Sequence, residues 1–439
     1  MARGPTILSK EDITRITVGG FKSISQEQSI EVKPLTILAG ANSSGKSSII
    51  QPLLLLKQTL EATYDPGPLL LNGPNVKFTS AEQLLARSYD EKPANSFHVG
   101  ITITGGSAAT TSFKQSTNKG FDLEETTYSN GAGERYRLSM GMPQDEIQSV
   151  YARSYLGYVL DSTPDIIPTV VQDRCFLKLN ASLKRKDILV PVHIPRYEQY
   201  LENSIQRIIH LPGLRGNPAR DYPVTAIGPT FPGTFEYYAA SIIEQWQIDK
   251  ESERLERLNA DLARIGLTRK VVARRKNATA IELLVDRFLQ GDKEDMVSIA
   301  DVGLGVSQAL PVLVALHTAK LEQLVYIEQP EIHLHPRAQS VMAEVLADAV
   351  TQGKRLVVET HSNLLLRGIQ TLVAEDKLSP ELVKLHWFKQ LEDGCTEITS
   401  ADLDETGAYG DWPEDFDDIT LESEGRYINA ASDKMLEGN

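Results

Sequence analysis

A phosphate-binding loop is the feature that most constrains the fold of this chain. Residues 40–47 read Gly-Ala-Asn-Ser-Ser-Gly-Lys-Ser and match the pattern GxxxxGK[ST]. An apolar run over 34–39 precedes the loop and predicts a buried strand, and an apolar stretch over 48–57 follows it and predicts a helix. Strand, glycine turn and helix are the context that this motif requires. The chain is therefore predicted to bind a nucleoside triphosphate on an α/β scaffold.

The spacing of the loop assigns a role to its residues. Glycines at 40 and 45 let the backbone curl so that its N–H groups face phosphate oxygens, at a helix N-terminus whose dipole favours anions. Lys46 is expected to contact the β- and γ-phosphates, and the Ser47 hydroxyl is expected to bind Mg²⁺. The predicted nucleotide-binding residues of the loop are Gly40, Asn42, Ser43, Ser44, Gly45, Lys46, Ser47 and Ser48.

Three later segments are predicted to complete the site. A strand over 324–327 leads to Glu328, and we expect this strand to lie beside the loop strand with its carboxylate on Mg²⁺. A second strand leads to His361, which is expected to contact the γ-phosphate. The glycine-spaced segment 298–308 opens an apolar helix and offers a second phosphate-binding surface through Gly303, Gly305 and Ser307. One phosphate tail cannot readily use both loops, so we expect a second chain to supply the second loop.

The order of these motifs resembles the ATP-binding-cassette (ABC) type ATPases. The resemblance is strongest to the soluble branch with OLD-type, RecF-type and structural-maintenance-of-chromosomes (SMC) heads, and it covers residues 13–60 and 205–418. The segments that carry it are Phe21–Ser23, Asp301–Pro311, Ile327–Pro336 and Glu359–Ser362. The ending, with 378–383 and 411–413 before an acidic tail, resembles a subgroup of stand-alone bacterial AAA-type ATPases, many of which are found beside anti-phage effector genes.

The resemblance implies ATP and Mg²⁺ as cofactors and a composite site in a homodimer or higher oligomer. It places Lys46, Ser47 and Glu328 on phosphate and metal, and Gly303, Gly305 and Ser307 on the nucleotide of the partner chain. His361 would sense the γ-phosphate, and residues 333–336 would form an inter-subunit loop. The resemblance does not assign the glutamine-loop residue, for which Gln83 is a candidate.

One position departs from the wider superfamily. The residue after the metal carboxylate is usually a catalytic glutamate, and here it is Gln329. An amide orients water but cannot take its proton, so general-base assistance of roughly 10²–10⁴ in rate is missing unless Glu331 supplies it. The sequence therefore predicts slow ATP hydrolysis. The predicted catalytic residues are Lys46, Gln329, Glu331 and His361.

At 439 residues, the chain is expected to form two or three lobes. The expected fold is α/β: an ABC-ATPase-like head, with a mixed sheet and flanking helices, and an inserted α/β or helical lobe. The expected domains are 1–80, the first part of the head; 81–205, an inserted or variable part; 206–295, a helical and strand lobe; 296–390, the second part of the head; and 391–439, an acidic segment.

Charge and cysteine content limit the partners. Of the net charge of −14, the segment 401–439 carries −10, from twelve acidic groups and two basic ones, so the remainder is close to neutral. A basic run from Arg254 to Lys276 is either a DNA-binding patch or a solvated helix face, and we favour the latter. Cys175 and Cys395 have no partners at metal-ligand spacing and are expected to be buried thiols. With no apolar run near the roughly 20 residues of a membrane span, the protein is expected to be cytoplasmic.

Two functions remain open from the sequence. The first is an ATPase that dimerises around ATP and regulates an effector protein from the same operon, a nuclease or toxin in anti-phage defence. The second is a RecF- or SMC-like DNA-repair or DNA-clamp ATPase that acts on DNA directly. A self-contained nuclease is a third, weaker alternative, because no dense carboxylate constellation stands outside the acidic tail.

Overall fold

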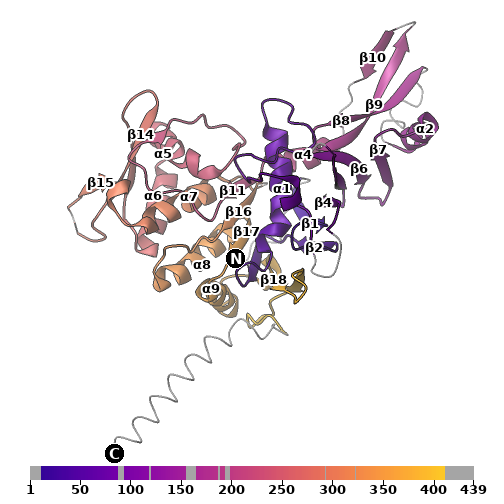
Figure 1. Cartoon of the computed structure of the whole chain (residues 1–439). Helices are drawn as coiled ribbons and strands as arrows, with labels where there is room; N and C mark the ends of the chain where they lie inside the picture. Colours follow the sequence, from indigo (N-terminus) through magenta and orange to yellow (C-terminus); the bar gives the residue numbers. More distant parts are fainter. Residues whose placement is uncertain are drawn as a thin grey trace, which may run out of the picture.

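The computed structural model describes residues 11–87, 93–117, 120–154, 165–185, 188–192, 198–291, 293–321 and 323–410. The predicted acidic tail beyond residue 410, with the segment 411–413, lies outside the described residues. The architecture is a mixed α/β fold with several sheets, as the sequence predicts (Figure 1). Among the described helices, none combines the length and apolar character needed to cross a bilayer.

A six-stranded sheet forms the centre of the molecule. Its order is β11 (Ile209–Leu211), β16 (Leu324–Glu328), β17 (Arg355–Thr360), β3 (Leu35–Gly40), β18 (Val383–Gln390) and β19 (Thr396–Ala401). The first five strands are parallel, and β19 returns antiparallel to β18. The carboxyl ends of the parallel strands therefore meet at one edge, where the phosphate loop begins.

The predicted neighbour of the loop strand is wrong. β16, which ends in Glu328, does not lie beside β3, because β17 lies between them and pairs with both. Both β16 and β17 are apolar strands that end at the site, and nothing in their composition shows which of them pairs directly with β3. The consequence is that β17 brings its own terminal residues next to the phosphate loop.

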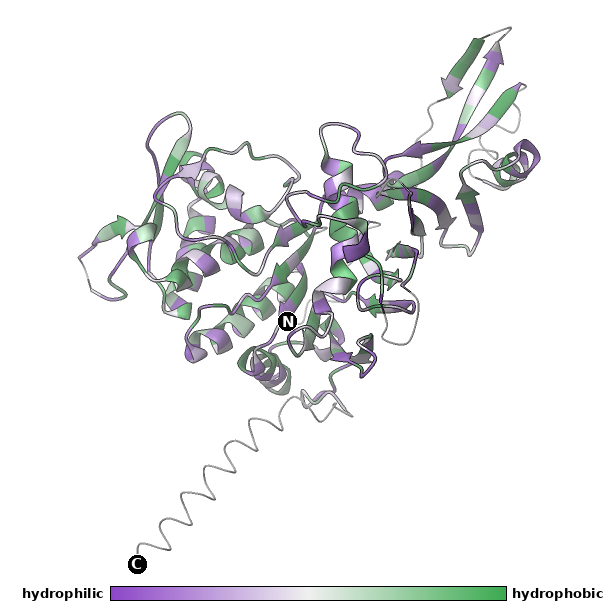
Figure 2. Cartoon of the chain, viewed as in Figure 1, coloured by the Kyte–Doolittle hydropathy of each residue, from purple (hydrophilic) through white to green (hydrophobic). Residues whose placement is uncertain are grey.

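The two faces of the central sheet bury different layers. Alternate residues such as Val325, Ile327 and Val358 pack with α7 (Leu304–Thr318), α8 (Pro336–Thr351) and α9 (Asn363–Ala374). Leu324, Tyr326 and others on the opposite face pack with α1 (Lys46–Glu61). Both α1 and α7 contain a proline and are buried along most of their length. α7 is apolar on most sides, in keeping with a helix that is covered by protein, whereas α1 also buries polar side chains (Figure 2).

A second sheet packs on the α1 side and leads to a projecting arm (Figure 1). It is antiparallel, in the order β2 (Gln28–Glu31), β1 (Ile13–Gly19), β4 (Ser96–Ile103), β5 (Ala108–Gln115), β6 (Phe121–Ser129) and β7 (Arg135–Ser139). α4 (Glu198–Gln206) packs against α1 beside this sheet. Farther out lie α2 (Gln144–Arg153) and a sheet of β10 (Ile188–Val192), β9 (Phe176–Arg185) and β8 (Ile166–Asp173). The predicted hairpin ahead of the loop is thus the β1–β2 pair.

The remaining elements form a lobe beside α7. It contains α5 (Ala239–Ile248), α6 (Ser252–Ile265) and a small sheet of β12 (Tyr222–Pro223), β14 (Ala280–Asp286), β13 (Val271–Arg275) and β15 (Met296–Ser298). These agree with the helical pattern over 236–265 and the strand pattern over 271–285. Strands pair across two of the expected domain boundaries: β1 pairs with β4 across residue 80, and β18 with β19 across residue 390. Both cysteines are buried and free.

Candidate nucleotide and metal site

The phosphate loop requires glycine at two positions. Gly40 and Gly45 have φ values of 146° and 94°, which disfavour residues with a side chain. Space excludes a side chain as well, because a Cβ on Gly40 would lie 2.3 Å from the Phe388 carbonyl oxygen and one on Gly45 would lie 2.1 Å from Thr396 Oγ1. The loop is therefore held from behind by β18 and β19, while Asn42 and Ser43 at its tip are exposed.

Lys46 lies inside the loop that precedes it. Its ammonium donates to the carbonyl oxygens of Gly40 and Ala41, at 3.0 and 2.7 Å, and its side chain is buried. Burial lowers the pKa of Lys46 to about 8, although the charge of Glu359 acts in the opposite direction. An anion in the loop would favour the charged ammonium, as phosphate binding requires. Ser44 and Ser48 are also buried.

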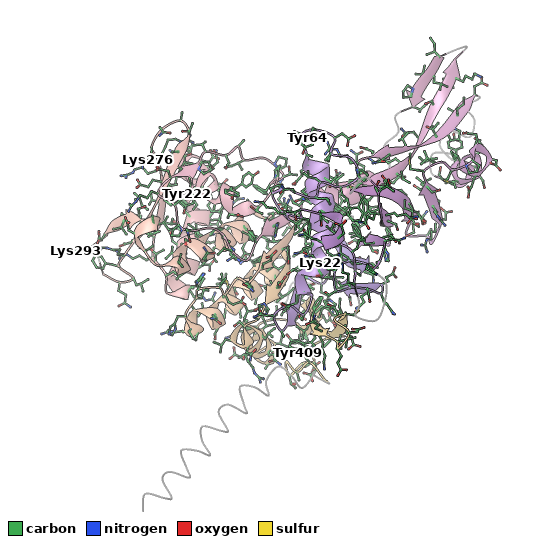
Figure 3. The ribbon with its side chains drawn as sticks, viewed as in Figure 1. Lys22, Tyr64, Tyr222, Lys276, Lys293 and Tyr409 are labelled. Carbon is green, nitrogen blue, oxygen red and sulfur yellow. The ribbon has the colours of Figure 1, made fainter. Side chains whose placement is uncertain are left out.

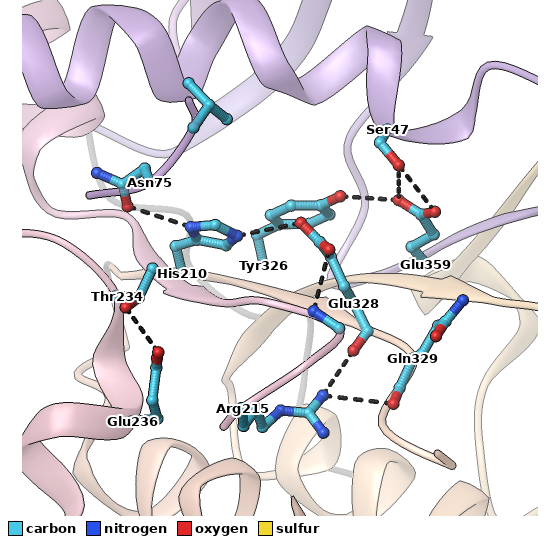
Figure 4. Close-up of polar contacts among 12 residues, drawn as sticks. Ser47, Asn75, His210, Arg215, Thr234, Glu236, Tyr326, Glu328, Gln329 and Glu359 are labelled. Atoms are coloured by element: carbon cyan, nitrogen blue, oxygen red, sulfur yellow. Dashed lines mark hydrogen bonds and ion pairs between the residues drawn. The ribbon is translucent and has the colours of Figure 1, made fainter. Parts of the chain in front are cut away.

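Ser47 contacts a carboxylate that the sequence prediction did not assign. Its hydroxyl donates to both oxygens of Glu359, at 3.0 and 2.9 Å (Figure 4). The Tyr326 hydroxyl also donates to Glu359, at 2.9 Å. Burial and the nearby charge of Glu328 raise the pKa of Glu359, while the Tyr326 and Ser47 hydrogen bonds and the charge of Lys46 partly oppose the rise. Glu359 ends the strand next to the loop, so its position follows from the order of the sheet.

Glu328 is held on the other side by groups from β11 and the turn after it. His210 Nε2 donates to Glu328 Oε1 at 3.1 Å, and the Gly213 amide donates to Oε2 at 3.0 Å (Figure 4). The His210 ring stacks on Tyr326, with ring centroids 5.4 Å apart. Burial opposes ionisation of Glu328, but His210, the Gly213 amide and Arg215 together outweigh it and lower its pKa. Glu328 is thus an ionised carboxylate at the site.

Glu331 and His361 connect the end of β16 to the phosphate loop. Glu331 Oε1 accepts from the Thr360 hydroxyl at 2.6 Å and from the His361 amide at 3.2 Å. Its other oxygen, Oε2, is buried without a hydrogen-bond partner, and burial raises the pKa of Glu331. His361 Nδ1 donates to the Gly40 carbonyl oxygen at 3.0 Å. Nε2 of the neutral ring is therefore an acceptor, and a contact with phosphate oxygen requires the imidazolium form.

Gln329 lies in a strained turn just after β16. Its φ is 47°, and its backbone N–H donates to the backbone carbonyl oxygen of Glu359 at 2.7 Å. The side-chain amide oxygen lies beside Gly213, in the turn after β11, whereas Glu331 contacts residues that follow β17. β17 neighbours the loop strand, so residues after β17 lie near the loop. Of Gln329 and Glu331, it is Glu331 that is linked to the loop: it accepts from the His361 amide, and the His361 ring donates to the Gly40 carbonyl oxygen.

The second glycine segment lies at the start of α7. Gly303 is exposed, and a Cβ there would meet no atom within 4 Å. Ser307 is buried, and its hydroxyl donates to the Leu304 carbonyl oxygen at 2.9 Å. Across the described residues, no hydrogen bond or ion pair joins 303–307 to the loop 40–47. The structure therefore joins His361, and through it Glu331, to the phosphate loop, and places Glu328 on the strand next to Glu359. It does not join the second glycine segment to the loop by such contacts.

Arg215 connects α7 to the metal strand. Its guanidinium donates to the backbone carbonyl oxygens of Gln308, at 3.2 Å, and Glu328, at 2.5 Å (Figure 4). The Gln308 side chain in turn accepts from the Arg215 amide and donates to the Gly216 carbonyl oxygen. Burial lowers the pKa of Arg215 to about 10, although Glu328 and Glu331 counteract this. Gln308 directly follows Ser307, so this contact joins the glycine segment to Glu328 within one chain.

The donor set agrees with the cofactors implied by the sequence. A hydroxyl and carboxylates are the hard oxygen ligands that suit Mg²⁺, and Mg²⁺ normally keeps one or two carboxylates together with substrate phosphates. No cluster of three or more His, Cys, Asp or Glu side chains that could hold a metal occurs in the part of the chain that the structure describes. A complete protein cage is thus not formed there, and phosphate oxygens would have to supply further ligands.

Several of these groups were missed by sequence reasoning. Glu359 begins the segment 359–362 that contributes to the family resemblance, but only His361 in this segment was predicted to have a role. Tyr326, His210 and Arg215 lay in apolar or turn segments that read as structure alone. Their position was the one signal that could have identified them. His210 lies in a strand and Arg215 in the turn after it, and Glu328 likewise ends a strand. Gln83 hydrogen-bonds Thr79 and lines a surface cavity of about 420 Å³ with Lys22 and other residues.

Two family models match parts of the chain. The model described as "AAA ATPase domain" matches residues 230–366, and the model described as "AAA domain, putative AbiEii toxin, Type IV TA system" matches residues 35–148. The first segment includes Glu328 and His361, and the second includes the phosphate loop. Both models describe ATPase-type domains, in agreement with the ATPase expected from the sequence. No curated protein matches the chain.

A comparison with solved structures finds SMC head domains, at low identity and low TM-score. A head bound to the C-winged helix domain of ScpA is 13% identical, with a TM-score of 0.46 over 90% of this chain and 98% of that chain. An SMC head from Thermotoga maritima is 12% identical, with a TM-score of 0.40 over 88% and 98%. A head with a coiled coil and joint from Pyrococcus yayanosii is 11% identical, with a TM-score of 0.44 over 90% and 97%.

Proposed function

We propose that this ATPase binds Mg²⁺–ATP, dimerises around it, hydrolyses it slowly, and so regulates a partner effector, a nuclease or toxin of bacterial anti-phage defence. One observation carries the proposal: Ser47 contacts Glu359, Glu328 lies on the strand next to it, and His361 contacts the phosphate loop, while Gly303 is exposed just before α7. When Mg²⁺ is bound, it would neutralise phosphate charge between Ser47 and these carboxylates. Lys46 would bind the phosphates from the opposite side.

The start of α7 supports a composite site. The first turn of this helix has no side-chain cap, so its amides are available to an anion. Leu304 beside Gly303 is 40% exposed and would be covered if a second chain packed on this helix start. A second chain that holds ATP on its phosphate loop would supply both the anion and the cover.

The proposed slow turnover follows from the residues around the attacking water. Gln329 has no basic group, and Glu331 is buried with one oxygen unpartnered. A carboxylate with a raised pKa accepts a proton more readily than an ordinary one, but here it also lies behind Thr360 and His361. An ATP-bound dimer with such a site would persist long enough to signal to an effector in a cytoplasmic switch.

The effector role is supported by the family model that names a toxin, which matches residues 35–148 and so includes the phosphate loop. The DNA-clamp alternative is weakened by the basic run. Every cation of this run pairs with an acidic residue: Arg254 with Glu251, Arg257 with Glu253, Arg264 with Glu344 and Asp348, Arg269 with Asp286, Lys270 with Glu294, Arg274 with Glu282, Arg275 with Glu244, and Lys276 with Asp221. Lys276 lies on the outer side of the lobe, and even there its ammonium is paired with the carboxylate of Asp221 (Figure 3). DNA binding needs cations that are available to phosphates.

The trans site is tested by mixing two inactive chains. Lys46→Ala removes the phosphate-loop ammonium, and Gly303→Arg fills the exposed start of α7 without a clash in its own chain. A heterodimer of the two retains one intact site, formed by Lys46 of one chain and Gly303 of the other. We expect ATPase activity in the mixture that neither variant shows alone. Gly303→Ala is the matched control and should behave like the wild type.

The result that would overturn the proposal is a mixture as inactive as its components, together with an active wild type that stays monomeric with ATP. Retention of ATP affinity by folded Lys46→Ala would contradict the binding site itself. Purification with the product of the neighbouring gene, followed by ATPase assay with and without DNA, separates the effector role from the DNA-clamp role. Stimulation by DNA alone would favour the DNA-clamp role.

A further inference from the structure

Glu359 holds a carboxylate directly against the hydroxyl that the phosphate loop offers to a metal. Ser47 Oγ lies 3.0 Å from Oε1 and 2.9 Å from Oε2 of Glu359. The Tyr326 hydroxyl fixes Oε2 from the far side, at 2.9 Å. Glu359 is only 6% exposed, so its position is determined by these contacts and not by solvent.

Glu328 stands on the neighbouring strand at the same level. The register of β16 and β17 pairs the Cα atoms of Glu328 and Glu359, and paired residues of adjacent strands point to the same face. Tyr326, two residues before Glu328, also lies on that face and reaches Glu359. Glu359 therefore contacts Ser47 directly, and the Glu328 carboxylate, predicted from the sequence as the metal ligand, stands next to Glu359 on the adjacent strand.

The charges of this arrangement need a cation when ATP is present. The triphosphate would enter next to the buried carboxylate of Glu359, where Lys46 supplies a single positive charge from the phosphate loop. Like charges that cannot be solvated repel strongly. A Mg²⁺ ion between Ser47, Glu359 and the phosphates would turn this repulsion into ligation.

The separation of the Ser47 hydroxyl and the Glu359 carboxylate, which is that of their hydrogen bond, also permits such a position. Oxygen ligands of Mg²⁺ lie at about 2.0–2.1 Å and at right angles, so neighbouring ligands stand about 2.9 Å apart. Ser47 Oγ and the Glu359 oxygens already have this separation. We propose that Glu359 is a second carboxylate ligand for the Mg²⁺ of Mg²⁺–ATP, beside Ser47, with Glu328 on the adjacent strand. This inference rests on the proposed ATP binding.

If Glu359 is a metal ligand, its replacement should change how strongly ATP affinity depends on Mg²⁺. If Glu359 only holds Ser47 in place, that dependence should stay the same. The probe is a fluorescent ATP analogue, titrated into the full-length chain with excess Mg²⁺ and, separately, with EDTA. For Glu359→Gln, which keeps the shape and the acceptor for Ser47, we expect weaker affinity with Mg²⁺ and stronger affinity in EDTA. The ratio of the two affinities should fall on the order of ten- to a hundredfold. Mn²⁺ binding in the presence of ATP, followed by EPR, should weaken to the same degree.

Glu359→Asp is the second variant. It keeps the charge but withdraws the carboxylate by one methylene, so it should weaken Mn²⁺ binding while EDTA affinity stays low. A melting curve establishes that each variant is folded, and if Glu359→Gln does not fold, Glu359→Asp decides alone. An unchanged Mn²⁺ affinity in the folded variants would overturn the inference, as would equal losses with Mg²⁺ and with EDTA. Failure of the wild type to bind the analogue at all would instead overturn the proposed function.

Discussion

Replacement of Glu331 by glutamine tests which residue accepts the proton of the attacking water. Glu331 Oε1 accepts hydrogen bonds from Thr360 and from the His361 amide, and an amide oxygen keeps both. Oε2 has no partner, so the new NH₂ group loses no existing hydrogen bond. The substitution therefore removes the ability to take a proton while it changes the local packing little, and the variant should remain folded.

The expected loss follows from the value of general-base assistance. Such assistance contributes roughly 10²–10⁴ in rate, and each tenfold corresponds to about 1.36 kcal/mol of barrier, so Glu331→Gln should raise the barrier by about 3–5 kcal/mol. Gln329→Glu should change hydrolysis little, because the side chain at 329 lies beside Gly213, away from the loop. Wild-type turnover itself should stand below roughly 1 s⁻¹, the lower end of common values.

The assay is single-turnover hydrolysis of preformed enzyme–ATP complex between pH 5 and pH 8. Burial raises the pKa of Glu331, and only the deprotonated form accepts a proton. The rate should thus fall as pH decreases through that raised pKa, and Glu331→Gln should lack this limb. If the Glu331→Gln rate stays within about tenfold of the wild type, with the same pH profile, Glu331 is not the base. A large gain for Gln329→Glu would assign the water to position 329 instead.

Two further predictions concern stability. Arg215→Met removes donors to the carbonyl oxygens of Gln308, Glu328 and Gln329 in a buried site, so it should lower the free energy of unfolding by about 3–5 kcal/mol in urea titrations, and a loss below about 1 kcal/mol would contradict the proposed connection of α7 to β16. His386 donates to the Glu31 carbonyl oxygen and accepts from Ser400, and burial lowers its pKa to about 4. As pH falls from 7 to 5, His386 therefore becomes protonated in the unfolded chain but stays neutral in the folded one. This difference should lower the free energy of unfolding by about 2 kcal/mol. His386→Gln should lose that part of the pH dependence, and an equal slope in both proteins would refute it.

Local chemistry was readable without the fold. The glycines, lysine and serine of the loop, the apolar strands at 35–40, 324–328 and 355–360, and the helices that follow them are encoded by contiguous residues. Their spacing alone limits the backbone, because a GxxxxGK[ST] turn between strand and helix has one productive geometry. The same applies to Gln329, whose lack of a basic group is a property of the residue and not of its surroundings.

Sheet order was decided only by tertiary structure. Strand pairing joins residues hundreds of positions apart, and apolar strands of similar composition carry no mark of which one is inserted beside β3. That order places Glu359 against Ser47 and leaves Glu328 to His210 and Gly213. The burial of Ser307 and the exposure of Gly303 likewise depend on how α7 packs. A sequence names the groups that chemistry needs, but which of them touch is set by long-range pairing and by burial.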